Sequence, residues 1–194
     1  MNRYLSKTIL VVLSQLPGPS LCADINIIEV SREKGRYHLH TNTIVYARVD
    51  NVRRIITDYE NLTSIIPNLK ESKLLNKSEN GRTTVSMLTK MCVFFLCYKI
   101  RHVQTFHLIK NDILFSRIIP EKSDFKSGWM RWEIKEMDSD KMTPVTQIIL
   151  DIEVTPDFFI PPLIGPYQFK RKLLGVTRAT INKLEEKAKT NSPG

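Results

Sequence analysis

The stretch that decides the fold runs from residue 161 to residue 189 and reads PPLIGPYQFKRKLLGVTRATINKLEEKAK. Apolar or small side chains recur in it at steps of three and four residues, which is the spacing of one face of an α-helix. This face comprises Phe169, Leu173, Leu174, Val176, Thr180, Ile181 and Leu184. The other positions are mostly charged. The pattern predicts one long amphipathic helix whose apolar face is buried against another layer.

The chain between residues 69 and 155 is expected to supply that layer. It contains successive runs in which apolar and polar residues alternate, the period of a β-strand with one buried face, and no second long helical pattern. A further hairpin is predicted from residues 25–31 and 37–46, with its turn at Glu33-Lys34-Gly35. The arrangement indicates an α+β fold in which a curved antiparallel sheet is covered by the C-terminal helix.

Two short helices are expected between this hairpin and the later strands. The first spans residues 50–58, with Asp50 as the N-cap residue. The second is a helical turn over residues 58–62, which stops before Pro67 because proline disfavours helical geometry in the residue before it.

The first 23 residues do not belong to this pattern. Arg3 and Lys7 precede an apolar run over residues 8–16, and small side chains follow as far as Ala23, which is the order of a secretory signal peptide. The apolar run is shorter than the about 20 residues that span a bilayer. We expect cleavage after Ala23, a single domain over residues 24–194, and a secreted, periplasmic protein. An ordinary N-terminal helix is the alternative.

The overall composition is that of a folded, basic protein. Lys and Arg number 29 against 20 Asp and Glu, the formal net charge is +9, and 42% of the residues are hydrophobic. With 25% charged residues, this composition excludes an intrinsically disordered chain. The positive charge suits anionic lipid head groups, nucleic acid or acidic ligands alike. A secreted location makes nucleic acid the least favoured of these partners.

Cys92 and Cys97 flank four apolar residues in the segment MCVFFLC. A tight bend between strands would bring their thiols into bridging range, and an oxidising compartment would favour a disulfide. Two buried, reduced thiols are a nearly equal alternative. His38 and His40 lie two residues apart on a predicted strand, but nothing nearby offers a third metal ligand. We therefore expect neither a metal nor another cofactor.

Several short motifs point to a known family. The run Thr57-Asp58-Tyr59-Glu60-Asn61-Leu62 precedes Pro67 and a predicted strand over residues 70–75. Gly128, Trp132 and a predicted strand over residues 147–154 that ends in Thr155-Pro156-Asp157-Phe158 follow in the same order as in that family. Together they resemble the START-like SRPBCC superfamily, in its polyketide cyclase/dehydrase or coenzyme Q-binding branch. Within that branch they resemble a secreted bacterial type.

This resemblance implies a helix-grip fold of the START-like or Bet v 1-like kind. In that fold, two short helices near the N-terminus accompany a curved antiparallel sheet wrapped around a long C-terminal helix, with an apolar cavity between helix and sheet. Two departures concern the first short helix. Ala47-Arg48 stands where the family commonly has alanine-proline, and Arg53 stands where an aromatic or large apolar residue is usual.

His102 and Gln104 are the polar residues of most interest. They share a strand face with Tyr98 and Phe106, so unbroken alternation would point both beneath the C-terminal helix. A buried polar group without a partner costs about 1–3 kcal/mol, so a ligand, a water, or a side chain such as Arg117 or Glu133 should pair with them. The equal alternative is a β-bulge near Arg101 that turns both outward.

No motif for hydrolytic, zinc-dependent or phosphate-binding chemistry occurs in the sequence. The first hypothesis is therefore a secreted binding protein that encloses a lipid, isoprenoid or other apolar small molecule. The expected ligand-binding residues are Met87, Tyr98, His102, Gln104, Arg117, Met130, Trp132, Phe169 and Leu173. The alternatives are a cyclase/dehydratase-type enzyme with His102 as its proton-transfer group, and an adaptor that contacts a partner protein without a ligand.

The segment from residue 157 to residue 164 is apolar and follows the last predicted strand. It precedes Lys170, Arg171 and Lys172, so it is a candidate lid or membrane-touching loop, although a simply solvated helix face is the favoured explanation of the charges. We expect a monomer that makes transient contact with anionic membrane surfaces and binds no nucleic acid.

Overall fold

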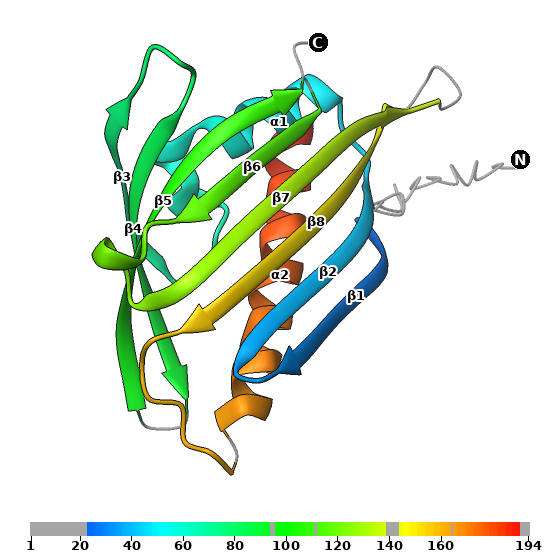
Figure 1. Ribbon diagram of the computed structural model, residues 1–194. Helices are drawn as coiled ribbons and strands as arrows, with labels where there is room; N and C mark the ends of the chain where they lie inside the picture. Colours follow the sequence, from blue (N-terminus) through cyan, green and yellow to red (C-terminus); the bar gives the residue numbers. More distant parts are fainter. Residues whose placement is uncertain (1–22, 94–95, 111, 139–143, 164, 191–194) are drawn as a thin grey trace, which may run out of the picture.

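The computed structural model describes residues 23–93, 96–110, 112–138, 144–163 and 165–190 (Figure 1). The residues of the predicted signal peptide, apart from Ala23, lie outside the described residues. The described chain forms one eight-stranded antiparallel sheet, and the long helix α2 (Gly165–Thr190) crosses one face of it. This is the α+β helix-grip fold that the sequence predicts.

The eight strands follow one another along the sheet with a single long crossover. Their order is β1-β2-β8-β7-β6-β5-β4-β3, so the link from β2 to β3 runs from one side of the sheet to the other. The strands are β1 (Asp24–Glu33), β2 (Arg36–Val45), β3 (Leu69–Lys77), β4 (Thr83–Val93), β5 (Leu96–Lys110), β6 (Ile113–Ile118), β7 (Phe125–Met137) and β8 (Val145–Pro156). The remaining strands are joined as hairpins or through short connections.

The crossover contains the two short helices that the sequence predicts, here α1 (Val49–Thr57) and the 3₁₀ helix η1 (Tyr59–Ser64). A further 3₁₀ turn, η2 (Pro120–Lys122), follows β6. Asp50 is not the N-cap residue: Arg48 takes that position without a side-chain bond, and Asp50 lies in the first turn. Arg53 is accommodated because its guanidinium reaches the main-chain oxygen of Ile134 at 3.3 Å.

Helix α2 begins at Gly165, four residues later than predicted, and ends at Thr190. Phe169, Ile181 and Leu184 are almost completely buried, as the helical period requires. Glu185 is a correction, because its side chain is only 3% exposed although the pattern assigns it to the solvated face. Its carboxylate is stabilised by the Lys189 ammonium, 2.5 Å away.

The hairpin of β4 and β5 carries the two cysteines. Cys92 and Cys97 are direct partners across the hairpin, with their Cα atoms 4.0 Å apart, and a disulfide joins them. Of the two alternatives that the sequence leaves open, the bridged form is the one in the structure. The bond links the two strands next to residues 94–95, which lie outside the described part of the chain.

Candidate functional site

An apolar cavity of about 220 Å³ lies between the sheet and α2. Its walls come from α1, from η1 and the segment after it, from side chains of β4 to β8, and from one face of α2. The lining residues include Met87, Phe106, Trp132 and Ile152 from the sheet and Leu173 from the helix. The alternation of each strand explains this lining, because every second residue of β4, β5 and β7 faces the helix.

Seven of the nine predicted ligand-binding residues line this cavity. They are Met87, His102, Gln104, Met130, Trp132, Phe169 and Leu173. Arg117 does not, because its neighbours Ser116 and Ile118 are the inward-facing residues of β6 and Arg117 is exposed. Tyr98 also does not line it: its ring packs against Phe158, with the centroids 6.0 Å apart, beside a separate small gap near the end of the β8–α2 segment.

His102 and Gln104 both face the cavity. The register of β4 and β5 is continuous from Thr83↔Phe106 to Val93↔Leu96, so there is no β-bulge near Arg101 and the outward-facing alternative is wrong. The side chains bond to each other, because Nε2 of Gln104 lies 2.9 Å from Nδ1 of His102. This proximity makes Nδ1 the acceptor and leaves the His102 proton on Nε2.

The two residues are part of a longer chain of polar contacts. Ser116 donates its hydroxyl proton to Oε1 of Gln104 at 2.7 Å, and Nε2 of His102 lies 3.4 Å from Oγ1 of Thr89. Arg117 and Glu133, the partners considered from sequence, take no part. Glu133 instead pairs with Arg131 and Lys135, because odd-numbered residues of this part of β7 face away from α2. The polar side chains of His102 and Gln104 are thus paired within the protein, without a ligand.

Burial lowers the pKa of His102 to about 4, and the negative charge of Asp124 opposes this effect only in part. The imidazole is therefore neutral at neutral pH. Among the described residues that line the cavity, none is acidic. A base whose pKa lies this far below neutrality is a weak proton acceptor, since general-base catalysis is most effective when the pKa lies near the working pH.

Sequence reasoning missed the roles of Ser116 and Thr89. Ser116 is 1% exposed and lies between Leu114 and Ile118 on the inward face of β6. The alternation of buried and less buried residues along β6 is the signal in the sequence that could have identified Ser116 as inward-facing. Its contact with Gln104 depends on the pairing of β5 with β6, in which Gln104 is opposite Ile118.

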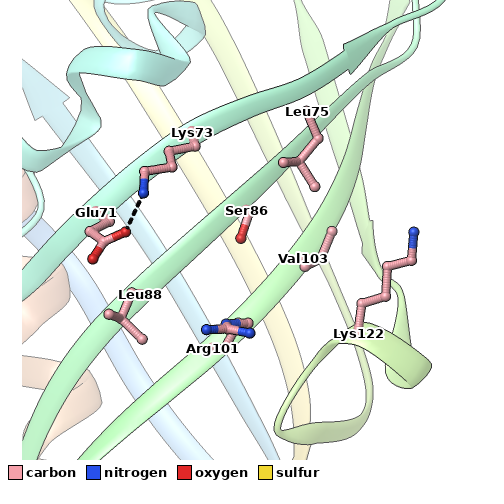
Figure 2. Close-up of a pocket in the computed structure, with 8 residues that line it drawn as sticks. All are labelled: Glu71, Lys73, Leu75, Ser86, Leu88, Arg101, Val103 and Lys122. Atoms are coloured by element: carbon pink, nitrogen blue, oxygen red, sulfur yellow. Dashed lines mark hydrogen bonds and ion pairs between the residues drawn. The ribbon is translucent and has the colours of Figure 1, made fainter.

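A second, larger hollow of about 400 Å³ lies on the opposite face of the sheet, across β3, β4 and β5 (Figure 2). Figure 2 shows Glu71 and Lys73 forming an ion pair there, with a separation of 2.7 Å, and Arg101 beside the apolar Leu88. Half of its lining residues are charged. Volume alone would favour this hollow, but its charged walls make it a poor container for an apolar molecule, so we take the inner cavity as the candidate site.

Within the described residues, no group of three His, Cys, Asp or Glu side chains is placed to hold a metal ion. His40 does have a partner: its Nδ1 lies 2.6 Å from Oδ1 of Asp151 on the face of the sheet away from α2.

The profile of the family described as "Polyketide cyclase / dehydrase and lipid transport" matches residues 45–169. This match covers more than half of the chain, so the chain belongs to that family. No curated protein matches the sequence. The matched range includes the cavity-lining residues of the sheet and ends at Phe169, near the start of α2.

Solved structures share the fold at low sequence identity. The protein TTHA0849 from Thermus thermophilus has a TM-score of 0.63 and 14% identity, over 80% of this chain and 99% of its own. The Zhui aromatase/cyclase from Streptomyces sp. R1128 has a TM-score of 0.61 and 15% identity, over 79% and 94%. A STAR-related lipid transfer protein from Xanthomonas axonopodis has 0.58 and 12%, over 84% and 98%. These neighbours include a cyclase and a lipid transfer protein, so the fold they share does not choose between the two activities.

Proposed function

We propose that this protein binds a lipid, isoprenoid or other apolar small molecule in the cavity between the sheet and α2. The observation that carries this proposal is the cavity itself, in which the walls are mainly apolar and the polar side chains of His102 and Gln104 bond to each other. An apolar ligand can therefore enter without leaving a buried polar group unpaired. The family and the lipid transfer protein of the same fold support this class of ligand.

The size of the cavity restricts the ligand. Its volume of about 220 Å³ lies below the roughly 300–1,000 Å³ of ordinary small-molecule sites. The conformation described here suits a single short chain or a small ring. A larger ligand requires α2 or the segment before it to move away from the sheet, and Leu173 and Val176 of α2 are only half-buried.

A cavity-blocking variant tests the proposal. Leu173→Trp places a larger side chain in the cavity, whereas Leu174→Trp makes the same change at a half-buried helix position that does not line it. We expect the wild type and Leu174→Trp to retain co-purified apolar molecules in native mass spectrometry, and Leu173→Trp to lose them at a similar melting temperature. Equal retention by all three proteins would contradict binding in this cavity.

We also propose that the protein is secreted to the periplasm after cleavage behind Ala23, and that it approaches membranes transiently. Phe159, Leu163 and Tyr167 are 70%, 95% and 63% exposed, an uncommon concentration of apolar side chains before and at the start of a basic helix. No helix in the described part of the chain is long and apolar enough to cross a membrane. Aromatic and leucine side chains next to lysine and arginine suit an anionic bilayer surface.

Vesicle binding tests the membrane proposal. We expect Phe159→Ser combined with Leu163→Ser to reduce co-sedimentation with vesicles of phosphatidylcholine and phosphatidylglycerol. Leu75→Ser combined with Leu108→Ser is the matched control, because both leucines are exposed on the sheet. An equal loss in both double variants would show that the loop has no special role.

The second candidate function is a cyclase/dehydratase-type reaction in the same cavity. The observation that favours it is the position of the His102 imidazole, which faces the cavity with its Nε2 proton toward Thr89. The low pKa of His102 weighs against a general base and leaves it as a neutral hydrogen-bonding group. The adaptor hypothesis would be favoured only if the cavity held no ligand in the native protein.

A further inference from the structure

A third hollow, of about 330 Å³, adjoins the apolar cavity on the α2 side. It is lined by Asn68, Gln168, Arg171, Lys172, Gly175 and Val176. Lys172 and Val176 also line the apolar cavity, so the two spaces share a wall. Because the Lys172 side chain is exposed, this shared wall lies where the cavity meets solvent.

The hollow is positively charged. From Gly165 to Leu184, helix α2 contains five Lys or Arg residues and no Asp or Glu. In the described part of the chain, no carboxylate forms an ion pair with Arg171 or Lys172. The guanidinium of Arg171 lies 5.8 Å from the centre of the Tyr167 ring, a contact that orients the side chain but leaves its charge uncompensated.

Polar groups without charge complete the lining. The amides of Gln168 and Asn68 can each donate hydrogen bonds into the hollow. Asn68 is held in a left-handed conformation, with φ of 66°. Its main-chain oxygen accepts a hydrogen bond from the main-chain N–H of Lys90, with an N···O distance of 2.9 Å. Gly175 has no side chain, and a Cβ placed there would meet open space, so nothing from this position fills the hollow.

We propose that this hollow is a head-group subsite and that the ligand is an anionic amphiphile, with a carboxylate or phosphate beside Arg171 and Lys172 and an apolar chain in the cavity. The inference rests on the proposed binding function and adds the charge of the ligand to it. The shared residue Lys172 explains how one molecule reaches both spaces: its aliphatic stem borders the apolar chain while its ammonium group pairs with the anion.

Four probes with the same ten-carbon chain test the charge of the head group. They are decanoate, decyl phosphate, decanol and decylamine, each measured against the full chain by calorimetry or by displacement of a fluorescent probe. We expect decanoate or decyl phosphate to bind about tenfold more tightly than decanol, as two solvent-exposed ion pairs would give, and decylamine to bind more weakly than decanol. The better of the two anions identifies the head group, and its advantage should shrink in high salt.

Two double variants separate a local site from general positive charge. Arg171→Gln with Lys172→Gln removes two charges from the hollow and should weaken anion binding about tenfold more than it weakens decanol binding, which loses only the apolar contact with the Lys172 stem. Arg101→Gln with Lys122→Gln removes the same charge from the outer hollow of Figure 2 and should change neither.

The outcomes also distinguish this inference from the function on which it rests. Decanol binding as tightly as the anions, or equal losses in both double variants, would overturn the head-group subsite and leave an apolar binding protein. If the wild type bound none of the four probes, the proposed binding function itself would be overturned for single-chain molecules, and the subsite with it.

Discussion

Gln104 Nε2 and His102 Nδ1 lie 2.9 Å apart on the inward face of β5. The two residues are neighbours in the alternating series that begins at Tyr98, and without this bond Nδ1 of His102 and Nε2 of Gln104 would each lose the partner that the structure gives it. Burial keeps His102 neutral, and the bond to Gln104 fixes its tautomer, since the same nitrogen cannot accept this bond and carry a proton. Several measurable consequences depend on this pair.

His102→Ala should destabilise the protein by about 1–3 kcal/mol, because it leaves the Gln104 amide without its partner in a buried position. Its effect on retention of an apolar ligand should be no more than a few-fold. Chemical denaturation and ligand retention measure the two effects, with His107→Ala, outside the cavity, as the control. A turnover that falls by about 10²–10⁴ in His102→Ala would instead establish an enzyme.

The low pKa of His102 predicts a pH dependence of stability. The unfolded histidine titrates near 6.5 and the folded one near 4, so between these values the unfolded chain binds more protons and the folded state loses stability as the pH falls. The full contribution is present above about pH 6.5 and could reach about 3 kcal/mol.

Denaturant unfolding at several pH values between 7.5 and 4 measures this dependence. His102→Gln removes the titrating group, so its free energy of unfolding should decrease less steeply over the same range. Carboxylate protonation contributes equally to both proteins and cancels in the comparison. Parallel curves for the wild type and His102→Gln would show that His102 is not held neutral by burial.

Two of the leucines of helix α2, Leu173 and Leu184, have different roles. Leu184 is 0% exposed in the core, so Leu184→Ala should cost about 2–5 kcal/mol of stability. Leu173 is half-buried and lines the cavity, so Leu173→Glu should reduce ligand retention and cost less stability than Leu184→Ala. Thermal and chemical denaturation compare them. If Leu173→Glu were the more destabilising change, the apolar surface at Leu173 would be packed core rather than cavity wall.

The Cys92–Cys97 disulfide closes a short loop, with a sequence separation of 5. Its removal by Cys92→Ser with Cys97→Ser should cost about 2 kcal/mol by the loop-entropy estimate.

A count of free thiols tests both this bridge and the removal of Cys22 with the signal peptide. If both predictions hold, protein purified from its native compartment should show no free thiol after denaturation. One free thiol with the mass of the full chain would contradict cleavage, and two in the processed protein would contradict the bridge.

Local periodicity determined much of this structure. The steps of three and four that join Phe169, Ile181 and Leu184 predict the long helix, and the alternation of β4, β5, β7 and β8 predicts the strands and their inward faces. These features can be read from sequence because the periods of 3.6 and 2 residues are properties of neighbouring residues. For the same reason, seven of the nine predicted cavity residues line the cavity.

The tertiary structure alone decided which polar groups meet. Gln104 and Ser116 are joined because β6 pairs with β5, and the Glu185 carboxylate meets the main-chain N–H of Tyr46 because the far end of α2 lies beside the end of β2. The approach of Asn68 to Lys172, which creates the hollow beside the cavity, joins residues more than 100 positions apart. Such meetings depend on the strand order and on the path of the helix, which no local pattern of residues contains.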